Sequence, residues 1–159
     1  MDIRVVAFDH PDAAKLTAEV QQEYVRRYGT EDETPVEAAE FALPRGLFLV
    51  GYLDGVPVAS GGWRVPDGSK TGLSAGDVEL KRMYVAESVR GRGYARAMLA
   101  ELERTALAAG GRRVVLETGT EQPEAIALYR SSGYGEIAAF GLYSDTPESR
   151  YYGKALVHH

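Results

Sequence analysis

The amino-acid sequence predicts a mixed α/β (α+β) fold in which helices flank a central sheet. Segments with the apolar periods of strands and helices follow one another as strand, two helices, three strands, helix, strand, helix and two strands. The chain has 159 residues, of which 45% are hydrophobic and 26% charged, and such values are typical of one soluble globular domain. We expect a single domain over residues 1–157.

The first third of the chain is expected to hold one strand and two helices. Residues 3–7 have the pattern of a strand. Asp12 is a candidate N-cap of a helix with apolar residues at four-residue steps, and Gly29 would end it near residue 28. Thr34 followed by Pro35 predicts the cap and first position of a short second helix.

The next two strands are predicted at 47–53 and 56–65. Asp54-Gly55 joins them, and this dipeptide between two β-rich runs predicts a hairpin of adjacent antiparallel strands. Turn-forming residues fill 66–76, so we expect a flexible loop there.

The central unit is a strand at 78–85, a short turn at 86–89 and a helix from about Arg92 to Gly110-Gly111. The apolar residues of this helix share one face; they are Ala95, Met98, Leu99, Leu102, Ala106 and Ala109.

The last third alternates strand and helix. We predict a strand at 113–117, a helix at 122–132 ended by Gly133, and strands at 134–139 and 150–157. A loop at 141–147 separates the last two strands. His158 and His159 form a tail that is either native sequence or the remnant of a purification tag.

The junction before the central helix has the features of an anion site. Gly91 and Gly93 flank Arg92 where the helix begins, and a helix N-terminus carries about half a positive charge with unpaired N–H donors. Residues 81–96 hold five basic residues against the single Glu87, a local net charge of +4 in a chain of net charge −5. We therefore predict a phosphate-binding loop at this junction.

Two common phosphate motifs are absent from this junction. A dinucleotide-binding fingerprint needs a third small residue where this chain has Arg96. A Walker loop needs Gly-Lys-Ser/Thr, which the sequence lacks.

Composition excludes several other classes. With no cysteine and three histidines, the chain offers no disulfide framework and no thiolate nucleophile, and we expect no metal site. A pI near 5.3 argues against nucleic-acid binding. We expect a cytoplasmic protein, because no apolar run is long enough to span a membrane and residues 1–5 lack the apolar core of a signal peptide.

Two segments carry a resemblance to a known family. Arg90-x-x-Gly93-x-Ala95 resembles the Arg/Gln-x-x-Gly-x-Gly/Ala signature of the GCN5-related N-acetyltransferases, the GNAT family. Residues 122–134 (QPEAIALYRSSGY) are similar to that family's Asn-x-x-Ala-x-x-Leu-Tyr-x-x-x-Gly-Phe segment, with Gln122 in place of asparagine. The resemblance spans about residues 47–156 and implies the GNAT fold, a mostly antiparallel mixed sheet whose central strands, from Val78 and Arg113, splay apart.

The resemblance also implies the ligand and the residues that hold it. The cofactor would be acetyl-CoA, with its pyrophosphate on the loop before the central helix and its amides on an unpaired strand edge. The cofactor-binding residues implied in this way are Met83, Tyr84, Val85, Arg90, Gly91, Arg92, Gly93, Tyr94, Ala95, Gln122, Ala125 and Tyr129.

Two residues are candidates for proton transfer. Tyr129 occupies the position of the family's general acid, and Glu79 a position at which some relatives carry a glutamate base. Each residue also has a structural interpretation: an aromatic packed between helix and sheet for Tyr129, and a carboxylate paired to a neighbouring cation for Glu79. Arg82 is a candidate for binding an acceptor carboxylate or for a salt bridge to a nearby acid such as Glu117.

The sequence therefore predicts an N-acetyltransferase that acts on a primary amine by direct attack in a ternary complex. The acceptor, a small-molecule or protein amine, and the oligomeric state, monomer or homodimer, stay open. A non-catalytic acyl-CoA-binding or sensor domain of the same fold is the main alternative. A nucleic-acid-binding module is a third, disfavoured by the acidic composition.

Overall fold

The computed structural model describes residues 1–34, 36–66, 72–141 and 146–156. Its strands are β1 (Asp2–Val5), β2 (Gly46–Leu53), β3 (Val56–Arg64), β4 (Asp77–Val85), β5 (Arg113–Gly119), β6 (Gly135–Glu136) and β7 (Ser149–Ala155). Its α-helices are α1 (Pro11–Tyr28), α2 (Tyr94–Ala108) and α3 (Pro123–Ser131), and short 3₁₀ turns lie at η1 (Ala38–Phe41) and η2 (Glu87–Val89).

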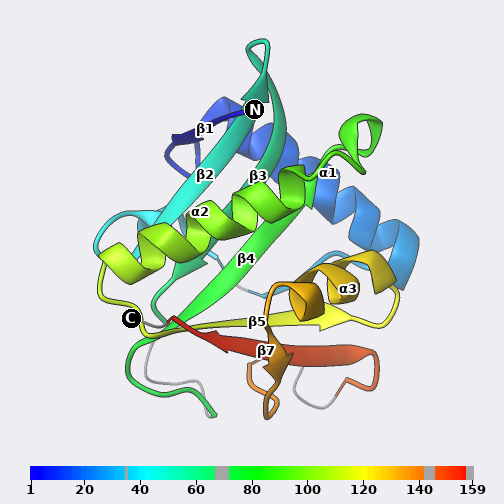
Figure 1. The fold of residues 1–159 in the computed structure, drawn as a ribbon. Helices are drawn as coiled ribbons and strands as arrows, with labels where there is room; N and C mark the ends of the chain where they lie inside the picture. Colours follow the sequence, from blue (N-terminus) through cyan, green and yellow to red (C-terminus); the bar gives the residue numbers. More distant parts are fainter. Residues whose placement is uncertain (35, 67–71, 142–145, 157–159) are drawn as a thin grey trace.

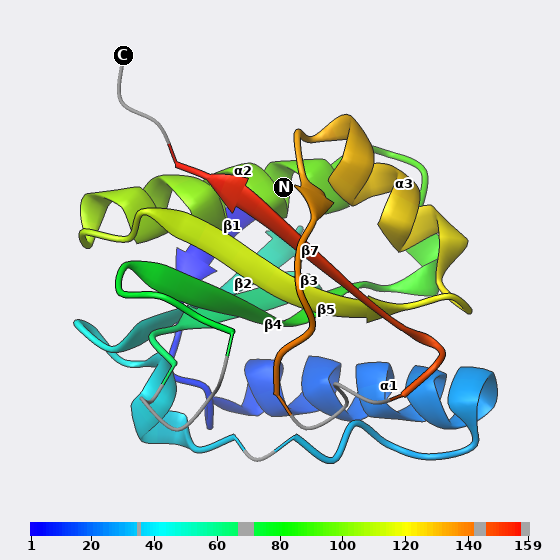
Figure 2. The same ribbon diagram turned by 90° about the horizontal axis from the view of Figure 1, so that it is seen from below.

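The strands form one sheet in the order β1-β2-β3-β4-β5-β7-β6. Neighbouring strands are antiparallel except for β4 and β5, which are parallel. Figure 1 shows α2 and α3 in front of this sheet, and Figure 2 shows α1 on its opposite face. The predicted mixed, mostly antiparallel sheet with flanking helices is confirmed.

Each face of the sheet has its own apolar core. The core under α2 and α3 includes Leu49, Trp63, Met98, Leu102 and Tyr152. The core under α1 includes Leu16, Val20, Phe41, Phe48 and Val50. The apolar face predicted for the central helix is therefore confirmed, except that Ala109 is exposed because α2 ends one residue before it.

The start of α1 differs from the prediction. His10, rather than Asp12, is the N-cap, because the His10 Nδ1 atom accepts a hydrogen bond of 3.0 Å from the Asp12 backbone N–H. Pro11 then takes the first helical position, where its missing N–H costs nothing. The predicted end is confirmed: Gly29 adopts φ 79° and donates its N–H to the Val25 carbonyl.

The second predicted helix is shorter and begins later than expected. It is the 3₁₀ turn η1, capped by Glu37 rather than Thr34, and the Glu37 and Glu40 side chains each bond the other's backbone N–H. This reciprocal cap fixes the start of the turn after the predicted position. Pro35 lies outside the described residues.

The hairpin is confirmed at Asp54-Gly55. Both residues adopt left-handed backbone conformations, with φ 49° and 80°, as a tight turn between twisted strands requires. The predicted loop at 66–76 lies partly outside the described residues, which omit 67–71. The same holds for 142–145 in the loop at 141–147, and for residues 157–159, including the two terminal histidines.

The strand predicted at 134–139 is wrong in length. The strand is limited to Gly135–Glu136, which pair with Gly153 and Tyr152 of β7. One further backbone hydrogen bond, from the Ile137 N–H to the Tyr151 carbonyl (3.0 Å), follows, and Phe140 then packs its ring against Tyr151 at a centroid distance of 5.1 Å. Burial of an aromatic side chain thus ends a segment whose composition favours a longer strand.

The parallel pair at the centre of the sheet is joined over a short distance only. Its register is Asp77↔Arg113, Val78↔Val114 and Glu79↔Val115, after which β4 and β5 diverge (Figure 1). The predicted splaying of these two strands is confirmed.

A β-bulge lies in β4 next to the divergence. Ser60 pairs with Tyr84 but Gly62 pairs with Lys81, so β4 holds one residue more than β3 over this stretch. Arg82, within the bulge, has φ 59°, a left-handed conformation that is uncommon for a residue with a side chain. The helices of the described residues include none with the length and apolar character of a membrane span.

Candidate functional site

A cleft of about 670 Å³ opens where β4 and β5 diverge. It extends from the start of α2 to the segment that follows α1. The residues predicted to bind a cofactor line it, apart from Arg92; they are Met83, Tyr84, Val85, Arg90, Gly91, Gly93, Tyr94, Ala95, Gln122, Ala125 and Tyr129. The fold therefore brings most of the predicted site together.

The loop before α2 has the geometry of an anion cradle. Gly91 and Gly93 adopt φ 81° and 84°, and no atom lies within 4 Å of the position that a Cβ would take at either glycine. Gly93 is the N-cap, without a side-chain cap. Ala97 donates to the Gly93 carbonyl at 3.1 Å, so the N–H groups of the preceding turn remain available to a ligand.

The arginines around this cradle have different partners. Arg90 donates from Nε to the Val85 carbonyl (2.9 Å) and from Nη2 to Glu23 (2.7 Å). Arg96 donates to Ser131 and Ser132 and so links α2 to α3. Arg92 is exposed between the two glycines. Arg90 and Arg96 thus brace the walls of the cleft, whereas Arg92 lies outside its lining.

The free edge of β4 forms the middle of the cleft. Because the ladder to β5 ends at Glu79 and Val115, the edge from Met83 to Val85 has no β5 partner and faces the cleft. Backbone groups on such an edge pair readily with the amides of an extended ligand. Together with the cradle, this edge fits a long ligand that carries phosphates at one end and amides along its length.

Tyr129 lines the same cleft. It is buried on α3, and its ring packs against Tyr134 at a centroid distance of 5.6 Å. Its hydroxyl has no hydrogen-bond partner among the described residues. Burial raises the pKa of this phenol above its ordinary value, so the hydroxyl keeps its proton at neutral pH. Gln122 caps α3 nearby and donates from Nε2 to the Tyr28 hydroxyl at 3.2 Å.

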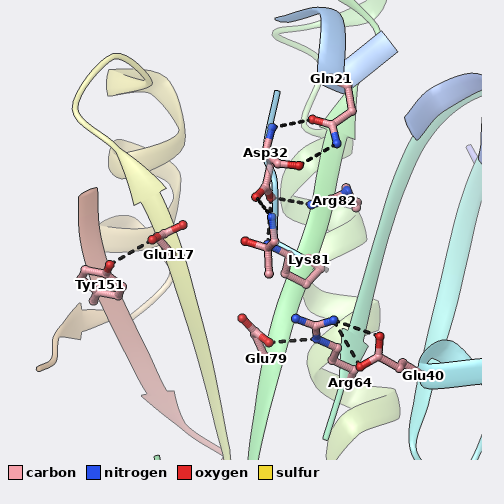
Figure 3. A network of polar contacts seen from close by, with 10 residues as sticks. Gln21, Asp32, Glu40, Arg64, Glu79, Lys81, Arg82, Glu117 and Tyr151 are labelled. Atoms are coloured by element: carbon pink, nitrogen blue, oxygen red, sulfur yellow. Dashed lines mark hydrogen bonds and ion pairs between the residues drawn. The ribbon is translucent and has the colours of Figure 1, made fainter. Parts of the chain in front are cut away.

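Glu79 lies outside the lining of the cleft. Its carboxylate is buried and accepts a hydrogen bond of 2.9 Å from Arg64 Nε. Arg64 also pairs with Glu40 at 3.2 Å (Figure 3). This placement favours the structural interpretation of Glu79, as the partner of a buried arginine.

Glu117 is the carboxylate that lines the cleft on β5. It accepts a hydrogen bond of 2.9 Å from the Tyr151 hydroxyl. Burial raises the pKa of its carboxyl group, partly offset by the Tyr151 hydrogen bond and by the positive charge of Lys81. A carboxylate with a raised pKa beside a cleft is a candidate proton acceptor.

Lys81 and Arg82 share one carboxylate on the β4 side of the cleft. Lys81 Nζ lies 2.9 Å from Asp32 Oδ2, and Arg82 Nη1 lies 2.5 Å from the same oxygen. All three residues line the cleft, and both cations are buried. Figure 3 shows this group facing Glu117 across the space between β4 and β5.

The charges of this group perturb one another. Burial alone would raise the pKa of the Asp32 carboxyl, but the two cations outweigh burial and hold it well below its usual value. Burial lowers the pKa of Lys81, and Asp32 opposes that shift. Gln21 fixes the backbone of Asp32 with two hydrogen bonds: its Oε1 accepts from the Asp32 N–H at 2.8 Å, and its Nε2 donates to the Asp32 carbonyl at 3.1 Å. Asp32 is therefore held in place as the shared anion.

Sequence reasoning missed several residues that line the cleft, among them Tyr24, Tyr28, Asp32, Lys81 and Glu117. The tyrosines lie at the four-residue steps of α1, a spacing that predicts an apolar face for them. For Glu117 a signal existed, because alternation along β5 places it on the face opposite Val114 and Leu116. Asp32 lies in an acidic segment whose pattern singles out no residue.

Among the described residues, no cluster of three or more histidine, aspartate or glutamate side chains has a geometry that could bind a metal ion.

Comparison with known proteins gives one consistent result. A sequence profile described as the acetyltransferase (GNAT) family matches residues 14–134. A protein of Azospirillum brasilense named IAA acetyltransferase is 33% identical over 129 residues, which cover 81% of this chain and 80% of that protein.

Solved structures give the same fold. A Klebsiella pneumoniae protein assigned as an acyl-CoA N-acyltransferase superimposes with a TM-score of 0.76 at 26% identity, covering 98% of this chain and 97% of that one. An aminoglycoside 6′-N-acetyltransferase in complex with coenzyme A superimposes with a TM-score of 0.71 at 14% identity, covering 100% and 99% of the two chains.

The charge group predicts a stability effect. Replacing Asp32 by Asn leaves Lys81 and Arg82 buried without their shared anion, and we expect a loss of about 3 kcal/mol in the free energy of unfolding. Urea unfolding followed by circular dichroism measures it. Glu31→Gln, which removes an exposed neighbouring charge, serves as the control and should change stability by less than about 0.5 kcal/mol. Equal stability of the two variants would contradict the prediction.

Proposed function

Because the chain belongs to the acetyltransferase (GNAT) family, we propose that it transfers the acetyl group of acetyl-CoA to a primary amine by direct attack in a ternary complex. One observation carries this proposal. A single cleft joins the anion cradle at Gly91 and Gly93, the free edge of β4, Tyr129 and Glu117.

The cofactor half of the cleft fits coenzyme A by its chemistry. The N–H groups at the start of α2 would hold the pyrophosphate, with the guanidinium of Arg90 or Arg92 near the anion. The edge from Met83 to Val85 would pair with the amides of the pantetheine arm. The bound cofactor supplies an acetyl group already activated as a thioester.

Acetyl transfer forms one C–N bond and breaks one C–S bond, and it moves two protons. The attacking amine must lose a proton, and the departing thiolate must gain one. Tyr129 is our candidate donor to the thiolate, because its buried phenol is protonated and its hydroxyl has no partner among the described residues. The backbone N–H groups near Tyr84 and Val85 are candidates to stabilise the acetyl oxygen.

Glu117 is our candidate for the group that accepts the amine proton. It lines the cleft, and its pKa is raised toward the range in which a carboxylate works as a base near neutral pH. Glu79, the base expected from the resemblance, is held by Arg64 outside the lining. The structure thus supports Glu117 over Glu79 for this role.

A screen of amines for thiol release from acetyl-CoA tests the proposal. A thermal-shift titration with coenzyme A runs beside it. Stabilisation by coenzyme A with no turnover on any amine would favour the alternative of a non-catalytic acyl-CoA sensor. If coenzyme A does not stabilise the protein and no amine gives turnover, both the acetyltransferase and the acyl-CoA sensor are overturned. The names of the relatives point to different acceptors, so the acceptor must be found by experiment.

The cradle predicts a specific loss of cofactor affinity. Gly93→Ala places a side chain at φ 84° in the cradle, and we expect at least about tenfold weaker binding of coenzyme A by isothermal titration. Gly55→Ala is the matched control, with φ 80° in the hairpin and nothing within 4 Å of the added Cβ at either position. Both variants carry similar backbone strain. Equal affinities in the two would show that the cradle does not bind the cofactor.

Removing the phenol hydroxyl tests Tyr129. In Tyr129→Phe we expect kcat to fall at least about tenfold, with little change in coenzyme A affinity, because the ring and its packing against Tyr134 remain. Steady-state kinetics and calorimetry measure the two quantities. A variant as active as the parent would remove Tyr129 from the chemistry.

The raised pKa of Glu117 predicts the pH dependence of kcat. A base works when deprotonated, so kcat should rise with pH through a midpoint above the ordinary carboxyl value and then level off. Glu117→Gln should remove this acidic limb and lower the plateau about a hundredfold. Glu79→Gln is the comparison and should keep the limb. If Glu117→Gln keeps the acidic limb and Glu79→Gln removes it, Glu79 is the base instead.

A further inference from the structure

Arg82, which lines the cleft, has unused hydrogen-bonding capacity. Its side chain is 2% exposed, and its guanidinium donates from Nη1 to Asp32. Its Nε atom is buried and has no hydrogen-bond partner among the described residues. A buried donor without a partner costs about 1–3 kcal/mol, so its presence in a native fold needs a reason.

The chain's own acids are held away from this donor. Nε and Nη2 form one edge of the guanidinium, and this two-donor fork matches the two oxygens of a carboxylate. The Asp32 carboxylate cannot turn to cover the fork without giving up Lys81 at Oδ2 and the hydrogen bond of 3.0 Å that Oδ1 accepts from the Thr34 N–H. Glu79 is committed to Arg64, and Glu117 accepts from Tyr151 on the opposite strand.

The local charge also favours one further anion. Two buried cations, Lys81 and Arg82, share the single carboxylate of Asp32, which leaves a positive charge on the β4 wall. Across the strand divergence, the β5 wall carries Glu117 (Figure 3). The acceptor end of the cleft thus has a cationic wall and a carboxylate wall that face each other.

We propose that the acceptor is a free amino acid. Its carboxylate binds the Nε–Nη2 fork of Arg82, and its amine lies toward Glu117. This assignment rests on the function proposed above and specifies its substrate class. A polyamine or the N-terminus of a protein offers an amine without the adjacent carboxylate, and leaves the fork of Arg82 without a partner.

Pairs of acceptors test the assignment. Each common L-amino acid is compared with its carboxamide, which keeps the side chain and the amine and removes the negative charge. We expect a preference for the best amino acid of at least about thirtyfold in kcat/KM. The comparison is stringent, because the carboxamide lowers the pKa of the neighbouring amine and leaves more of it neutral and reactive.

Variants of Arg82 tie that preference to the fork. Arg82→Gln should lower kcat/KM for the amino acid about a hundredfold and change that for the carboxamide little, so the preference disappears. Arg82→Lys keeps the positive charge but lacks the two-donor fork, so it should retain only part of the preference for the amino acid. Arg104→Gln, which removes an exposed arginine of α2, is the control and should keep the preference. Coenzyme A affinity and melting temperature show that each variant is folded.

A binding measurement gives a second readout. Isothermal titration of the preferred amino acid into the protein saturated with coenzyme A should show binding in the parent and at least about tenfold weaker binding in Arg82→Gln.

The outcomes separate this inference from the proposed function. Acetylation of amines with no preference for the carboxylate, or a preference that survives Arg82→Gln, would overturn the amino-acid assignment and leave the acetyltransferase in place. This is also the outcome expected if only water binds the Nε–Nη2 fork of Arg82. A protein that neither binds coenzyme A nor releases thiol with any amine would overturn the proposed function first.

Discussion

The divergence of β4 and β5 is the constraint on which the site depends. Two adjacent parallel strands would ordinarily pair along their whole length, because backbone N–H and C=O groups inside a protein need partners. Here the pairing stops after Glu79 and Val115. Bulky and charged groups flank the gap on both faces, with Tyr129 of α3 on one side and the Lys81–Asp32–Arg82 group on the other. The unpaired edges thereby become a place where an extended ligand supplies the missing partners.

The half of the site near the start of α2 could be predicted because its signals are local. Gly91 and Gly93 stand next to each other in the chain and in the structure, and both adopt the left-handed conformation that glycine allows at low cost. The helix that follows, the hairpin at Asp54-Gly55 and the end of α1 at Gly29 depend on the same kind of short-range rule. Errors in this part concern which residue caps an element, as at His10, and leave the architecture unchanged.

The half of the cleft that holds Asp32, Arg82 and Glu117 could not be predicted in the same way, because its residues come from separate parts of the chain. Asp32 follows α1, Arg82 lies within β4, and Glu117 lies within β5. No spacing rule connects residues so far apart. For Glu79 the strand position alone pointed to a base, but the choice of partner belongs to the tertiary structure, which places Arg64 of β3 beside it. Charged residues of strands therefore need the fold before they can be divided into ion pairs and catalytic groups.

The bulge in β4 shows how one backbone irregularity changes the reading of the sequence. In a regular strand, Lys81 and Arg82 would point to opposite faces of the sheet, because side chains alternate. The extra residue beside Ser60 and Gly62 breaks this alternation, and both cations reach the same oxygen of Asp32. The left-handed backbone of Arg82, at φ 59°, costs about 1–2 kcal/mol, and Ser60 Oγ supports it by donating to the Arg82 carbonyl at 3.2 Å. A fold that needed only core packing at this point would place an apolar residue in a regular strand. Core packing alone requires neither the left-handed backbone nor the buried, unpartnered Nε of Arg82, a residue that lines the cleft.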